Sequence, residues 1–268
     1  MNLIYFLVNE INTNGQNINF YLRKICQYLN KYKFDNNKPK KLLKLILGNL
    51  HKDSLNENEI NINDKITMNE LKAFECFNKN KYKTSKISKL YTGTLKKILC
   101  CINCKKKYYK FKTFKVISID IDIGNKYLNF KDKLYNDNFT REIESKKYSC
   151  FNCKKRKFSI SNNFYYACPE VLIICFDKKS ENIKNSFNID LFLELDMNKY
   201  IEKKDSKNDY KYILNSFIEY DKKQIEYISY INFNNNIWRK MNKENTYEIN
   251  INDKKNIINP QILFYEKI

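Results

Sequence analysis

The stretch that decides the fold is "CINCKKKYYKF" (residues 101–111), which nearly recurs as "CFNCKKRKF" (residues 150–158). Each copy is a Cys-x-x-Cys turn followed by basic residues. A tight turn of this kind brings two sulfurs to one side, and two turns supply the four thiolates of a tetrahedral zinc site. We therefore predict one structural zinc ion, held by Cys101, Cys104, Cys150 and Cys153.

Three alternatives to an occupied zinc site stay open at this stage: a redox pair, an empty vestigial site, and chance recurrence in a lysine-rich chain. A thioredoxin-like Cys-x-x-Cys begins a helix inside a βαβ unit, and neither turn here does. The 45 residues between Cys104 and Cys150 exceed the usual ribbon spacing. The intervening segment must therefore leave the site and return as a partner strand. Cys100 is adjacent to Cys101 and could compete as a ligand.

The length and composition of the chain exclude several classes of protein. The chain has 268 residues, of which 43% are hydrophobic, enough for one large domain or two small ones with a buried core. Its longest apolar runs have six residues, "LIYFLV" and "VLIICF", whereas a membrane-spanning helix needs about 20. We therefore expect no membrane span. We also expect no signal peptide. Nine cysteines in such a chain indicate a reducing compartment, either cytoplasmic or nuclear.

The formal net charge of +20 suggests nucleic-acid binding, but the residue types argue against it. Only four of the 50 basic residues are arginine, and arginine supplies the bidentate contacts on which base recognition relies. Dispersed lysines are usually a solvated surface. A zinc-ribbon protein that binds nucleic acid through this basic surface is kept as the alternative function.

The hydrophobic pattern predicts helices first and an antiparallel sheet afterwards, which is an α+β arrangement. The predicted helices cover residues 20–32, 40–55 and 68–79. The predicted strands cover residues 114–123, 171–175, 210–220, 226–233 and 261–266, and residues 198–209 are predicted to form a loop.

Ordered pieces of the chain resemble the ubiquitin-specific proteases nearly from end to end. Upstream of the second cysteine turn these are "LLKLILGNLHKDSLNEN" (42–58), "SKISKLYTGTLKKILCCINC" (85–104) and "FKVISIDIDI" (114–123). From that turn onward they are "CFNC" (150–153), "CPEVLIICFDKK" (168–179), "YKYILNSFIEY" (210–220), "IEYISYI" (225–231), "IWRKMNK" (237–243) and "PQILFYE" (260–266). The resemblance implies a papain-like cysteine protease fold with thumb, fingers and palm, which we place at residues 1–88, 89–165 and 166–268. It also implies that the zinc ribbon lies in the fingers, which grip ubiquitin.

The resemblance fails at the positions that carry the chemistry. The opening "MNLIYFL" (1–7) is similar to the stretch that follows the family's nucleophilic Cys, so we expect that Cys to fall before Met1. Glu226 stands where the family has its general-base His, and Lys243 stands where it has the orienting Asp. Of the family's polar residues at these positions, only Asn242 is retained. We expect a surface or capping role for His51, the sole histidine, and we assign no catalytic residue.

The sequence therefore predicts a diverged ubiquitin-specific protease that binds ubiquitin or a ubiquitinated protein. In an active relative, the activity would be thiol-dependent hydrolysis of bonds to the ubiquitin C-terminal glycine. Two explanations fit the missing groups: a catalytically inactive member, or a truncated chain. Truncation would account for the nucleophile but not for Glu226 or Lys243, so we favour an inactive or severely impaired enzyme.

Overall fold

The structure is a computed structural model, and it describes part of the chain. The described residues are 39–53, 56–57, 72, 83–121, 150–155, 158–178, 187–188, 192–201, 209–221, 226–232, 237–242, 246–250, 257–258 and 260–268. The helix predicted at residues 20–32, and all but one residue of that predicted at 68–79, lie outside them. The chain divides into two compact units, residues 1–60 with 80–90 and residues 61–79 with 91–268. The boundaries that we placed at 88/89 and 165/166 stay a prediction.

The first unit contains helix α3 (Pro39–Asp53), which confirms the helix predicted over residues 40–55. Pro39 opens it, a position where the fixed φ of proline is tolerated. Strands β1 (Asn56–Glu57) and β2 (Lys83–Thr84) pair antiparallel, and helix α5 (Lys86–Tyr91) follows them. Ser85 caps α5, because its Oγ accepts a hydrogen bond from the Ser88 backbone N–H at 2.9 Å while Ser88 Oγ accepts one from the Ser85 N–H.

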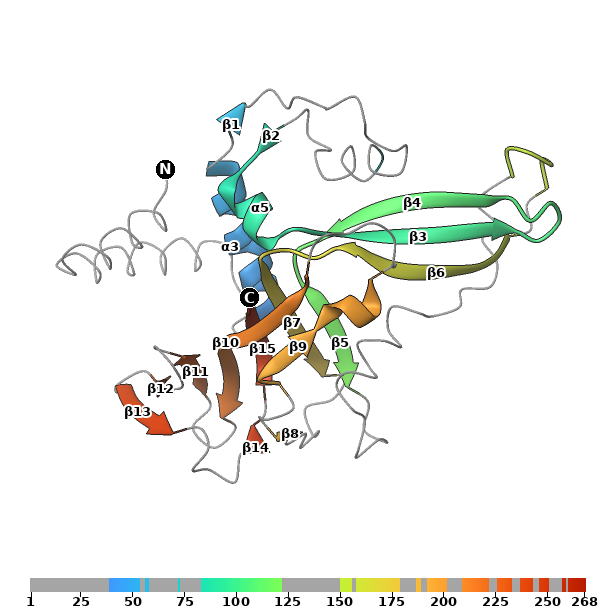
Figure 1. The fold of residues 1–268 in the computed structure, drawn as a ribbon. Coiled ribbons are helices and arrows are strands. Elements are labelled where there is room, and N and C mark those ends of the chain that lie inside the picture. The colour runs from blue at the N-terminus through green and yellow to red at the C-terminus, as the bar shows by residue number, and fades with distance from the viewer. Residues whose placement is uncertain are drawn as a thin grey trace. The chain divides into compact units, whose positions relative to one another are not determined.

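The second unit is built on a large sheet whose strands follow the order β13-β12-β11-β10-β15-β7-β5, with β9 also paired to β10 (Figure 1). The strands are β5 (Ile117–Ile121), β7 (Val171–Lys178), β9 (Glu194–Asp196), β10 (Lys211–Asp221), β11 (Glu226–Asn232), β12 (Ile237–Met241), β13 (Thr246–Asn250) and β15 (Pro260–Lys267). A separate short pair joins β8 (Phe187–Asn188) to β14 (Ile257–Ile258). We call the large sheet the palm sheet.

Strands β7, β10, β11 and β15 confirm four of the five predicted strands. The fifth, predicted over residues 114–123, is wrong at its start, because β4 (Lys107–Phe114) ends at Phe114 and β5 begins only at Ile117. The purely antiparallel sheet is also wrong, since β5 pairs parallel with β7. A parallel pair needs a long crossover between its strands, and residues 122–170 provide the length.

The loop predicted over residues 198–209 begins as the 3₁₀ helix η2 (Met197–Tyr200). Asp196 caps this helix by accepting a hydrogen bond from the Asn198 N–H at 3.0 Å. The loop over residues 198–209 is predicted from the many polar residues of that stretch. That prediction missed this short turn because Met197 and Tyr200 are buried against the palm core.

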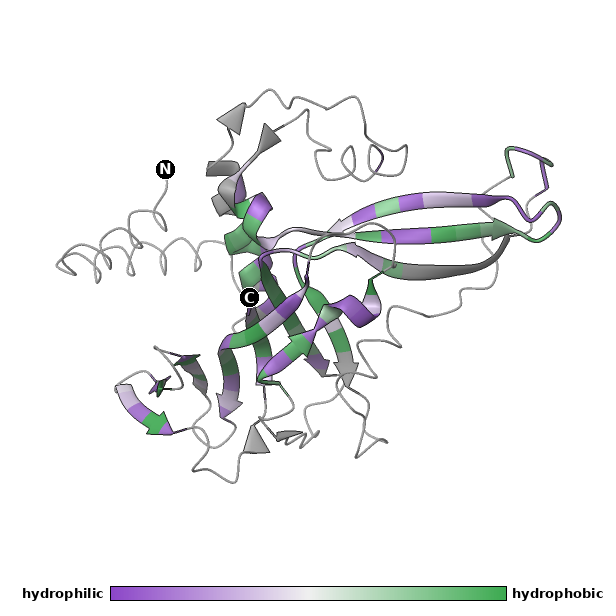
Figure 2. Ribbon diagram, in the orientation of Figure 1, coloured by the Kyte–Doolittle hydropathy of each residue, from purple (hydrophilic) through white to green (hydrophobic). Residues whose placement is uncertain are grey.

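Nearly half of the buried residues of the palm core are aromatic. Phe217 stacks on Tyr230 with ring centroids 4.4 Å apart and meets Trp238 at 5.7 Å. All three side chains are buried and come from the adjacent strands β10, β11 and β12. Strand β7 is buried along both faces from Leu172 to Phe176, as its continuous apolar sequence predicts. Figure 2 shows the matching concentration of hydrophobic residues in this sheet.

The second unit also carries a three-stranded antiparallel sheet, ordered β4-β3-β6, which we call the fingers sheet (Figure 1). Its strands are β3 (Gly93–Cys101), β4 and β6 (Phe158–Ala167). Gly93 begins β3 at a position where a Cβ would overlap the Phe114 ring and lie 2.8 Å from the Ala167 carbonyl oxygen. The glycine therefore permits the close approach of all three strands. In the described residues, no helix is long and apolar enough to cross a membrane.

Two buried tyrosines of the palm sheet provide a matched test of this packing. The Tyr212 hydroxyl donates to the Pro169 carbonyl oxygen at 2.6 Å, whereas the Tyr265 hydroxyl has no hydrogen-bond partner among the described residues. Burial raises the pKa of both side chains, so both stay protonated. We expect Tyr212→Phe to lower the free energy of unfolding by about 1 kcal/mol and Tyr265→Phe to raise it by a similar amount.

Urea unfolding of the two variants measures this difference. Equal destabilisation by both substitutions would contradict the hydrogen-bond assignment, since the two changes remove the same atom from equally buried rings.

Candidate metal centre

Each cysteine turn folds into the same knuckle. In the first, the Lys105 N–H donates to the Cys101 carbonyl at 2.9 Å and the Cys101 N–H donates to the Lys106 carbonyl at 3.0 Å. In the second, Lys154 and Cys150 repeat this pattern with two hydrogen bonds of 2.8 Å. The recurrence in sequence is therefore a recurrence in backbone structure, which chance repetition of lysine-rich sequence does not account for.

The first knuckle is the turn between β3 and β4, and the second leads towards β6, the other neighbour of β3. Antiparallel pairing of both strands with β3 brings the two knuckles to the same end of the fingers sheet. The fold thereby brings together all four cysteines predicted as ligands. Their Sγ atoms lie within 4.8 Å of one another.

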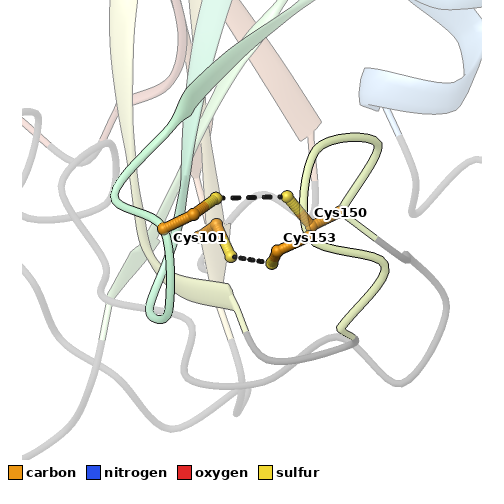
Figure 3. A group of neighbouring side chains, drawn as sticks. Cys101, Cys150 and Cys153 are labelled. Carbon is orange, nitrogen blue, oxygen red and sulfur yellow. Dashed lines mark hydrogen bonds between the residues drawn. The ribbon is translucent and has the colours of Figure 1, made fainter.

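The shortest sulfur–sulfur contacts join the two knuckles (Figure 3). Cys101 Sγ lies 3.5 Å from Cys153 Sγ, and Cys104 Sγ lies 3.5 Å from Cys150 Sγ. A tetrahedral zinc ion with Zn–S bonds of about 2.3 Å requires sulfurs about 3.8 Å apart. The donor set, its number and its spacing fit such an ion. All four cysteines are free thiols rather than disulfides.

Tyr108 on β4 supports the site from outside the sulfur cluster. Its hydroxyl lies 3.1 Å from Cys150 Sγ and accepts a hydrogen bond from the Asn152 N–H at 3.3 Å. Burial raises the pKa of Cys150, but hydrogen bonds from Tyr108 and from the backbone of Cys153 and Asn152 outweigh it and lower the pKa to about 6. The pKa of Cys104 is also lowered, chiefly by a hydrogen bond from the Lys106 backbone. The lowered pKa values of these two thiols favour the thiolates that bind metal. At Cys153 a hydrogen bond from the Lys155 backbone lowers the pKa, but burial and the neighbouring sulfurs outweigh it and raise the pKa to about 11.

The sequence analysis missed Tyr108. Nothing local distinguishes it from Tyr109, the next residue, because only the pairing of β3 with β4 decides which of the two faces the cysteines. The register sets Tyr108 opposite Leu99 and Tyr109 opposite Ile98. Leu99, Cys101 and Cys150 form the buried cluster against which Tyr108 packs.

The other residues singled out from the sequence lie elsewhere. Cys100 Sγ lies 3.5 Å from the Lys105 carbonyl oxygen and does not join the four sulfurs. His51 Nδ1 lies 2.6 Å from Ser85 Oγ, the oxygen that caps α5. Glu226 begins β11 directly across from Asp221 on β10, and Lys243 lies outside the described residues.

Comparison with protein families identifies the fold that holds this centre. The family model described as ubiquitin carboxyl-terminal hydrolase matches residues 7–265. The chain belongs to this family. No curated protein matches the chain in sequence.

Several SAGA DUB modules are among the solved structures of the same fold. One contains Ubp8, Sgf11, Sus1 and Sgf73 bound to monoubiquitin, with a TM-score of 0.51, 18% identity, and 68% of this chain and 41% of that chain covered. The same module bound to ubiquitin aldehyde gives a TM-score of 0.52, 18% identity, and coverage of 68% and 42%. The yeast module with an Sgf73 mutant gives a TM-score of 0.52 and 18% identity, with 76% of this chain and 46% of that chain covered. The matches cover less than half the length of those chains, and at this identity they establish the fold alone.

Removal of one ligand sulfur tests the metal centre. We expect the wild-type protein to retain one zinc ion per chain after dialysis, and Cys150→Ser to retain none, because three thiolates no longer close the tetrahedron. Metal analysis by mass spectrometry measures the stoichiometry. Cys100→Ser is the matched control and should keep the ion, since its sulfur lies outside the cluster. Loss of metal from both variants, or from neither, would contradict the ligand set.

Backbone strain at the knuckles gives a second test. Lys105 and Lys154 each have φ of 57°, a conformation that costs a side chain about 1–2 kcal/mol. Glycine removes this strain but adds about 0.5–1 kcal/mol of unfolded-chain entropy. We expect Lys105→Gly or Lys154→Gly to raise the free energy of unfolding of the metal-loaded protein by about 0.5 kcal/mol.

The neighbouring substitutions Lys106→Gly and Lys155→Gly are the controls. Neither position has positive φ, so glycine there adds only entropy and should lower stability. Chemical unfolding at saturating zinc compares the four variants. If glycine changes the free energy of unfolding equally at the positive-φ positions and at the control positions, the positive φ angles do not store strain.

Proposed function

We propose that the chain is a ubiquitin-binding member of the family that has lost peptidase activity and whose fingers are held by one zinc ion. The observation that carries this proposal is the residue at the start of β11. By the family resemblance this position belongs to the general-base His, and here it is Glu226. The register of β10 and β11 sets it across from Asp221, so this corner of the palm sheet carries two acidic residues.

A glutamate does not replace the histidine in this chemistry. The nucleophilic thiol of a cysteine peptidase is activated by an imidazole with a pKa near 7, which accepts its proton and remains beside the thiolate as a cation. A carboxylate that takes the proton becomes neutral, and one that does not repels the thiolate. Lys243, at the position of the orienting Asp, brings a positive charge where a base would need a negative one. Together these residues favour binding without turnover.

Ubiquitin as the ligand is supported by the family and by the fold. Two of the similar DUB modules are described as bound to monoubiquitin and to ubiquitin aldehyde. The fingers sheet and the palm sheet are both present in this chain. Zinc would tie the tip of the fingers sheet and supply folding free energy there. Cysteines that stay reduced and bind metal are typical of reducing compartments, which supports a cytoplasmic or nuclear location.

Ubiquitin binding is tested by titrating the zinc-loaded protein into isotopically labelled ubiquitin. We expect saturable amide shifts along the hydrophobic patch and C-terminal tail of ubiquitin that persist at physiological ionic strength. A ubiquitin variant with its hydrophobic patch replaced by alanine is the control and should not respond. No shifts from a folded sample would contradict ubiquitin binding, and tight binding to single-stranded DNA with steep salt dependence would favour the nucleic-acid alternative.

Loss of activity is tested separately with ubiquitin that carries a fluorogenic group on its C-terminal glycine. We expect no release above the rate in buffer. Release of the fluorophore that continues in Cys100→Ser, and that stops when the protein is treated with a thiol-alkylating reagent, would show that the chain is an active enzyme.

A further inference from the structure

The tip of the fingers sheet presents two exposed apolar side chains at matching positions. Ile102 follows the first cysteine of one knuckle and is 40% exposed, and Phe151 follows the first cysteine of the other and is 81% exposed. Exposed apolar side chains that gather in one place, unlike scattered single ones, mark interaction sites. Phe151 is the most exposed large hydrophobic residue in the part of the chain that the structure describes.

Lysines surround this apolar pair. Lys105, Lys106 and Lys107 after the first knuckle, and Lys154 and Lys155 after the second, are all exposed. The hairpin of residues 93–114 contains seven lysines and no acidic residue. No ion pair involves these five lysines among the described residues. We call Ile102, Phe151 and these five lysines the tip cluster.

Backbone hydrogen bonds order the two knuckles that carry the tip cluster. Each knuckle is closed by two of them, and the four sulfurs of the two knuckles lie within 4.8 Å of one another. The Phe151 ring lies 5.9 Å from the Tyr108 ring, so one side of it is supported by the sheet. Anchor side chains that are ordered before binding lose little conformational entropy when they enter a pocket.

We propose that the tip cluster is a docking surface for an acidic segment of a partner protein, with Phe151 and Ile102 as its apolar anchors. The charge of the cluster is complementary to such a segment, and buried aromatic anchors ringed by charged residues are the usual energetic centre of a protein interface. The surface is built from residues other than those at the family's base position, so this inference does not depend on ubiquitin binding.

Two other anionic partners fit the cluster less well. Single-stranded nucleic acid is bound by stacking bases on aromatic rings and guanidinium groups, but of the two apolar anchors only Phe151 has a ring. An anionic membrane needs more apolar surface, since even one acyl chain gives only marginal attachment. An acidic protein segment uses both anchors and the lysines.

The test uses fluorescence polarisation with the full-length, zinc-loaded chain. The probe is a labelled peptide of Asp and Glu residues with one Leu and one Phe at its centre. We expect saturable binding that weakens as salt is raised, and at least about tenfold weaker binding by Phe151→Ala. The matched control is Tyr247→Ala, which removes a ring 51% exposed on β13 and should leave the affinity unchanged.

Several outcomes would overturn the proposal. These are no saturable binding of the peptide, equal affinity of Phe151→Ala and wild type, or a single-stranded oligonucleotide of equal charge or anionic phosphatidylserine vesicles binding more tightly than the peptide. Displacement of the peptide by ubiquitin would show that the tip belongs to the ubiquitin site. Retained zinc in Phe151→Ala confirms that a loss of binding reflects the side chain and not an unfolded knuckle.

Discussion

The convergence of four sulfurs at the end of the fingers sheet is the constraint on which the rest of this region depends. The three finger strands have only a small buried cluster at their far end, formed by Leu99, Cys101 and Cys150. Two of its three members are themselves candidate metal ligands. Hydrophobic burial alone is therefore weak there, and a metal ion that binds four thiolates would supply the missing free energy. A bound ion would also tie together the two knuckles that carry Ile102 and Phe151.

The palm sheet is stabilised in a different way. Its core is a continuous set of buried apolar and aromatic residues, in which Phe217, Tyr230 and Trp238 bridge three neighbouring strands. None of these contacts involves the residue at the family's base position. The register that sets Glu226 across from Asp221 is fixed by the remaining pairs of β10 and β11. A fold held by such packing can persist after its catalytic groups have been replaced, which is why membership of a hydrolase family does not by itself establish hydrolysis.

The two proposed binding functions rest on different observations within one unit. Ubiquitin binding is inferred from the family and from the presence of both sheets, whereas the docking of an acidic segment is inferred from Ile102, Phe151 and the lysines beside them. Together the two proposals describe a chain that brings ubiquitin and a second protein together without cleavage. The metal centre would serve both, because it holds the finger strands and orders the tip.

The sequence by itself determined the parts of this protein that depend on local pattern. The paired cysteine turns predicted the four residues that meet, and apolar periodicity predicted α3, β7, β10, β11 and β15 to within a few residues. The tertiary structure alone decided what depends on pairing between distant segments. The parallel pairing of β5 with β7 and the choice of Tyr108 over Tyr109 beside Cys150 follow from strand pairing and register. Register is set by contacts between residues far apart in the chain, and no local periodicity carries that information.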